Sequence, residues 1–95
     1  KGIIHACGPR WLDGSRGEQE LLALTHQNII TTALKHGFSS IAIPAISTGV
    51  YRFPVEVAAF VSINTCKHLL AENNGLSIMF VMSEYDKFTI YKSFL

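Results

Sequence analysis

Cysteine is scarce, because only Cys7 and Cys66 occur among the 95 residues. Their separation excludes a CxxC motif, and no Cys/His cluster has the spacing of a zinc site, so we expect no bound metal. Both residues are interpreted as buried thiols in a reducing compartment. This predicts an intracellular protein, located in the cytoplasm or the nucleus.

An excess of charge and long apolar runs are also lacking. Eight Lys plus Arg balance seven Asp plus Glu, for a net charge of +1, which argues against nucleic acid as a partner. Polar residues interrupt every apolar run before the roughly 18 residues needed to span a bilayer. The first residues, Lys1 to His5, lack the long apolar core of a signal peptide, so no membrane association is expected.

The length leaves room for a single domain, residues 1–95, and excludes a two-domain architecture. Hydrophobic residues make up 48% of the chain, a proportion typical of packed globular proteins. Short apolar runs predict buried strands at residues 2–7, 40–44 and 77–82. Helical periodicity, with Gly37 as a C-cap and Pro54 at a helix start, predicts helices at 18–36, 54–72 and 85–95.

This alternation of strands and helices predicts an α/β fold, with a mainly parallel central sheet and helices on both faces. Ligands of such sheets bind beyond the carboxyl ends of the strands. The loops expected there are residues 8–17, 45–53 and 83–84.

The segment from Pro44 to Pro54 is the most informative, because it leaves a strand and enters a helix. Its backbone N–H groups and the helix N-terminus could face an anion, with the hydroxyls of Ser47 and Thr48 as further donors. Gly49 is expected to adopt a positive φ and to allow close approach. The alternative is an ordinary strand-to-helix turn, since the segment has neither a Walker A lysine nor GxGxxG spacing.

Three motifs in this order, IIHACGPRW, IAIPAISTGVYRFP and FVMSEYDKFTIY, resemble the macro domain, an ADP-ribose-binding module, in its bacterial and MacroD-type branch. The resemblance implies a three-layer α/β fold and no cofactor. It also implies that the central loop wraps the pyrophosphate and distal ribose of ADP-ribose through backbone amides. The residues to which this role carries over are Ser47, Thr48, Gly49, Val50 and Tyr51, with Arg52 and Phe53 at the edge. At the position of Arg52 this branch usually has glycine.

Two further departures from the family pattern matter. Ser83 stands where these proteins often place an aromatic residue on the adenine side of the ligand, with Phe80 and Tyr85 nearby. The N-terminal part of the family fold, with its first glycine-rich phosphate loop and the proposed catalytic residues, has no counterpart here. The chain therefore resembles the C-terminal portion of a macro domain, and no catalytic residue is assigned.

The function implied is binding of ADP-ribose, either free or attached to a protein. One alternative is hydrolysis of ADP-ribosyl groups or of O-acetyl-ADP-ribose by the full domain. Another is a degenerate α/β module kept for protein interaction.

Other reactive residues have structural interpretations. We expect His5 to be a buried strand histidine, Cys7 to pack in the core and Trp11 to anchor its loop. The histidines His26, His36 and His68 are expected at the surface or at helix ends. The charges of Asp13, Arg16 and Glu18 are expected to be solvated.

Overall fold

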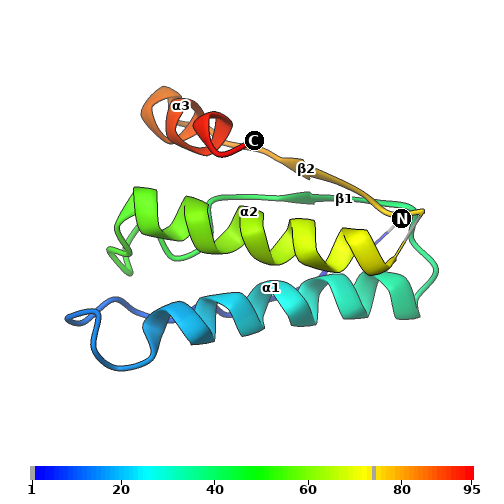
Figure 1. The fold of residues 1–95 in the computed structure, drawn as a ribbon, viewed down its shortest axis with the longest axis horizontal. Coiled ribbons are helices and arrows are strands. Elements are labelled where there is room, and N and C mark those ends of the chain that lie inside the picture. The colour runs from blue at the N-terminus through cyan, green and yellow to red at the C-terminus, as the bar shows by residue number, and fades with distance from the viewer. Residues whose placement is uncertain (1, 74) are drawn as a thin grey trace.

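The computed structural model describes residues 2–73 and 75–95, and it contains three helices and two strands (Figure 1). In chain order these are α1 (Glu18–Lys35), β1 (Ser40–Ile43), α2 (Val55–Glu72), β2 (Ser77–Phe80) and α3 (Tyr85–Ser93). The first and last residues of each element lie within two positions of the predicted bounds. None of the described helices is long and apolar enough to cross a membrane.

The two strands are parallel, as expected, and residues pair from Ser40 with Ser77 to Ile43 with Phe80. Hydrogen bonds from Ser77 N–H to Ser39 O and from Val81 N–H to Ile43 O extend the pairing at both ends, at 2.9 Å each. The carboxyl ends of both strands therefore lie side by side. The loops that follow them start from the same edge of the sheet.

The helices lie against one face of this sheet. Side chains that point to this face are Ile41, Ile43, Ile78 and Phe80, whereas Ser40, Ala42, Ser77 and Met79 point the other way and are exposed. Phe80 contacts the core beneath α1 and α2, and its ring lies 5.7 Å from that of Tyr91 in α3. The α/β class is confirmed, but among residues 2–73 and 75–95 no helix covers the second face.

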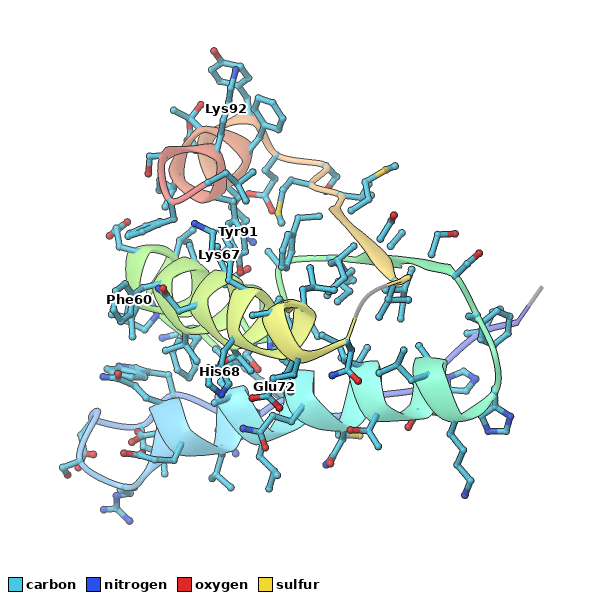
Figure 2. The ribbon with its side chains drawn as sticks, turned by 45° about the vertical axis from the view of Figure 1, so that its right-hand side comes forward. Phe60, Lys67, His68, Glu72, Tyr91 and Lys92 are labelled. Carbon is cyan, nitrogen blue, oxygen red and sulfur yellow. The ribbon has the colours of Figure 1, made fainter. Side chains whose placement is uncertain are left out.

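Three apolar clusters hold the helices in place. The first joins Ile30 and Ala33 of α1 to Ile43 of β1 and Cys66 of α2. The others place the loop residue Phe53 between α1 and α2, and Tyr91 against α2; Tyr91 points from α3 toward that helix in Figure 2. Helix α2 is the central helix, with α1 and α3 on either side of it.

The predicted first strand is not formed. Residues 2–7 form no ladder hydrogen bond with another described residue, Ile3 is 84% exposed, and His5 and Cys7 are exposed as well. A cavity of about 580 Å³ lies between this segment and β1, lined by Ile4, Phe38 and Ile41 among others. A strand needs a neighbour for its backbone groups, and none of the described residues provides one here. The expectations of a buried His5 and a buried Cys7 were therefore wrong.

Candidate functional site

The loop between β1 and α2 has a buried base and an exposed tip. Phe53 is 1% exposed and Thr48 is 8% exposed, whereas Val50 is 93% exposed. The tip comprises Gly49, Val50 and Tyr51. Apolar burial at the base thus fixes the loop on the core while its tip projects into solvent.

Hydrogen bonds within the loop close two turns. The N–H of Arg52 donates to Gly49 O, and the N–H of Phe53 donates to Ser47 O, both at 2.9 Å. The Thr48 hydroxyl donates to Ala45 O at 2.8 Å. The Ser47 hydroxyl is buried and has no partner among the described residues. The Thr48 hydroxyl is therefore directed into the loop and the Ser47 hydroxyl toward Gly8, contrary to the expectation that they face an anion.

The backbone N–H groups of the tip are free. Among residues 2–73 and 75–95, no protein acceptor receives a hydrogen bond from the N–H of Gly49, Val50 or Tyr51. Successive free N–H groups beside a helix N-terminus, here that of α2, form a favourable site for an anion. Phosphate oxygens are ligands of this kind.

The backbone strain of the loop lies at residues other than glycine. Ser47 has φ 69° and Arg52 has φ 60°, both in the left-handed region that glycine prefers. Gly49 does not have a positive φ, so that expectation was wrong. A Cβ atom at Gly49 would also meet nothing within 4 Å, which leaves open space for a ligand beside it.

The loop of residues 8–17 packs against this site. A Cβ atom at Gly8 would overlap the Ser47 hydroxyl, so only glycine permits this close approach. The N–H of Trp11 donates to Tyr51 O at 2.9 Å. The Trp11 ring lies edge-on to Phe53, with centroids 4.9 Å apart. The predicted anchoring role of Trp11 is confirmed, and its anchor is the base of the candidate site.

Comparison with known proteins identifies the family. The profile of the Macro domain matches residues 1–62, which is more than half of the chain. The chain belongs to the macro domain family. This confirms the resemblance inferred from the three sequence motifs.

Similar macro domain sequences occur in several bacteria. A macro domain-containing protein of Chlorobaculum tepidum is 45% identical over 74 residues, which cover 78% of this chain and 43% of that protein. O-acetyl-ADP-ribose deacetylase 1 of Pantoea vagans is 36% identical over 94 residues, which cover 98% of this chain and 55% of that protein. The chain thus spans about half the length of the curated relatives it matches.

Solved macrodomain structures show the same fold. The Oceanobacillus iheyensis macrodomain with ADP has a TM-score of 0.86 at 32% identity, covering 92% of this chain and 46% of that one. The Trypanosoma brucei macrodomain in complex with ADP-ribose has a TM-score of 0.74 at 26% identity, covering 79% of this chain and 33% of that one. The described residues therefore adopt the backbone arrangement of macro domains.

Glu18 organises the loop of residues 8–17, a role that sequence analysis missed. Its side chain is buried, and its carboxylate accepts four backbone hydrogen bonds of 2.8–3.0 Å, from residues 12, 13, 14 and 16. Burial by itself would raise the pKa of Glu18, but these N–H groups outweigh it and lower the pKa to about 2. The expectation of a solvated Glu18 was wrong. By contrast, Asp13 and Arg16 form an exposed pair at 3.5 Å.

Helix α3, which follows the third predicted loop, brings a lysine to the site. Ser83 is exposed, Phe80 packs in the core, and Tyr85 is 79% exposed with its ring 6.2 Å from that of Phe88. The ammonium group of Lys87 lies 3.4 Å from Thr48 O. Sequence analysis missed Lys87, because helical spacing gives no sign of a contact made 39 residues away.

The histidines of the helices have structural roles. Burial lowers the pKa of His26, although a hydrogen bond with Leu22 O opposes this, so the expected surface position was wrong. The exposed His68 lies 3.3 Å from Glu72 on α2 (Figure 2). Among the described residues, no three His, Cys, Asp or Glu side chains gather in a possible metal site.

Proposed function

We propose that this chain supplies the phosphate-binding loop of an ADP-ribose-binding macro domain, for a ligand that is either free or attached to a protein. The observation that carries the proposal is the row of free N–H groups at Gly49, Val50 and Tyr51, exposed beside the N-terminus of α2. These donors suit a pyrophosphate. Relatives of the same fold are described in complex with ADP and with ADP-ribose.

The remaining loop residues have distinct roles in this proposal. Thr48 shapes the loop from within through its hydrogen bond to Ala45 O, and Ser47 packs its buried hydroxyl against Gly8. Arg52 places an exposed cation at the edge, where it would favour a phosphate. Ser83 is proposed for the adenine side because it follows β2 at the same edge of the sheet.

Calorimetric titration with ADP-ribose, with AMP as the control ligand, tests the proposal after circular dichroism has confirmed folding. Val50 is the second residue of the turn closed by Arg52 N–H, a position where proline is favoured. Val50→Pro therefore removes one free N–H group without opposing the turn. Val50→Ala is the matched control, because it shortens the side chain but keeps the N–H.

We expect Val50→Pro to weaken ADP-ribose binding about ten- to hundredfold, the effect of one hydrogen bond to a charged group. Val50→Ala should bind like the unmodified protein. Equal affinity of both variants for ADP-ribose would show that the Val50 N–H does not contribute to binding. Failure of the folded, unmodified protein to bind ADP-ribose would refute the proposed function itself.

A second candidate function is hydrolysis of O-acetyl-ADP-ribose. It is favoured by the similarity to O-acetyl-ADP-ribose deacetylase 1 of Pantoea vagans, which extends over 98% of this chain. Incubation with O-acetyl-ADP-ribose and measurement of released acetate tests it. Ligand binding without acetate release would support a binding module over an enzyme.

A further inference from the structure

Lys87 connects α3 to the phosphate-binding loop. It lies in the first turn of α3, and its side chain is only 15% exposed. Its ammonium nitrogen is 3.1 Å from a carboxylate oxygen of Glu84 and 3.4 Å from Thr48 O. The exposed Glu84 thus holds one side of the ammonium group while the loop carbonyl lies on another.

The carbonyl that Lys87 contacts is the middle one of three in the loop. Ser47 O accepts the N–H of Phe53, and Gly49 O accepts the N–H of Arg52. Among the described residues, Thr48 O has Lys87 as its hydrogen-bond donor and receives no backbone N–H in the loop. The backbone therefore fixes the outer two peptide groups, whereas a side chain fixes the middle one.

The orientation of this middle peptide decides where one ligand donor points. A trans peptide is planar, so the carbonyl of Thr48 and the N–H of Gly49 point in opposite directions. Glycine offers little resistance to rotation of this peptide, and nothing lies within 4 Å of a Cβ position at Gly49. Without a tether, the carbonyl oxygen could turn toward the space meant for an anion.

We propose that Lys87 is a positioning residue for ADP-ribose binding. By holding Thr48 O, it keeps the Gly49 N–H directed outward, ready to donate to a phosphate oxygen. The charge of the ammonium group also polarises the peptide, which makes the Gly49 N–H a stronger donor. This inference rests on the proposed function, since its ligand is the pyrophosphate of ADP-ribose.

The test compares Lys87→Met with Lys92→Met by calorimetry with ADP-ribose. Lys92 is a suitable control because it lies on the same helix and points away from the loop, 5.8 Å from the Phe88 ring centroid (Figure 2). We expect Lys87→Met to weaken binding on the order of tenfold. Lys92→Met should not change the affinity. Lys87→Arg should restore most of it, because arginine can also donate to Thr48 O.

The amide resonance of Gly49 in ¹H–¹⁵N spectra separates positioning from general stability. It should shift in Lys87→Met without ligand, while the melting temperature stays close to that of Lys92→Met. Lys87→Gln is the second variant if Lys87→Met does not fold. Unchanged affinity together with an unmoved Gly49 resonance would overturn the inference.

The same measurements distinguish this inference from the proposed function. If the unmodified protein does not bind ADP-ribose, the proposed function fails, and the role of Lys87 in binding fails with it. A Gly49 resonance that still shifts in Lys87→Met would then show that the tether exists but serves another purpose.

Discussion

Arg52 is expected to weaken the fold, and its replacement by glycine should stabilise the protein. Its φ of 60° lies in the left-handed region, where a side chain crowds the following carbonyl. Among residues 2–73 and 75–95, no hydrogen bond or ion pair involves the Arg52 side chain. Removing that side chain therefore breaks no hydrogen bond or ion pair with the described residues.

The net effect of Arg52→Gly follows from two opposing terms. Relief of the left-handed conformation contributes about 1–2 kcal/mol to stability. The greater freedom of glycine in the unfolded chain costs about 0.5–1 kcal/mol. We expect a net gain of about 0.5–1 kcal/mol, which corresponds to a rise in melting temperature of about 2–8 °C for a domain of this size.

Thermal unfolding followed by circular dichroism measures this shift. Arg10→Gly is the matched control, because Arg10 is also exposed but does not have a positive φ, so its replacement should lower the melting temperature. Arg52→Ala keeps the strain and should change stability little. A melting temperature for Arg52→Gly at or below that of Arg10→Gly would refute the argument from backbone strain.

Three further predictions concern the loops and the cysteines. Because the pKa of Glu18 is lowered to about 2, its contribution to stability is complete above pH 4.5 and is lost as the pH falls toward 2. Glu18→Gln should therefore make the free energy of unfolding depend less on pH between 4.5 and 2. An unchanged pH dependence would contradict the lowered pKa. Gly8→Ala should destabilise the protein by about 1–3 kcal/mol in urea unfolding, since its Cβ overlaps the Ser47 hydroxyl. If the variant is as stable as the unmodified protein, Ser47 moves aside at no cost. Burial raises the pKa of the Cys66 thiol to about 12, so a thiol reagent should modify the exposed Cys7 first in the folded protein; equal rates at both residues would argue against the core described above.

Sequence analysis located the helices and the two strands well because their signals are local. Gly37 follows the end of α1, and Pro54 directly precedes α2, so their backbone restrictions act within a few residues. The loop from Pro44 to Pro54 was predicted as the candidate site on similar grounds. Its small residues between a strand and a helix are visible without any tertiary contact.

Sequence analysis failed where the outcome depends on residues distant in the chain. Residues 2–7 are apolar enough for a strand, but a strand also needs a paired neighbour, which the described residues do not provide. The exposure of Cys7 follows from the same cause. The left-handed conformation falls on Ser47 and Arg52 and not on Gly49 for a different reason, because the local hydrogen bonds that close the loop determine its path.

The sequence by itself determined the macro domain family, the order of the helices and the strands, and the loop that presents its amides to solvent. These depend on periodicity, on chain-breaking residues and on motifs that are contiguous along the chain. Only the tertiary structure decided that Glu18 binds the loop of residues 8–17 and that Gly8 and Trp11 support the loop between β1 and α2. It also decided that Lys87 reaches Thr48. The contacts of Gly8, Trp11 and Lys87 join segments that are far apart in the chain, and no local pattern encodes them. The contacts of Glu18 lie within six residues, but they depend on the path that the loop takes.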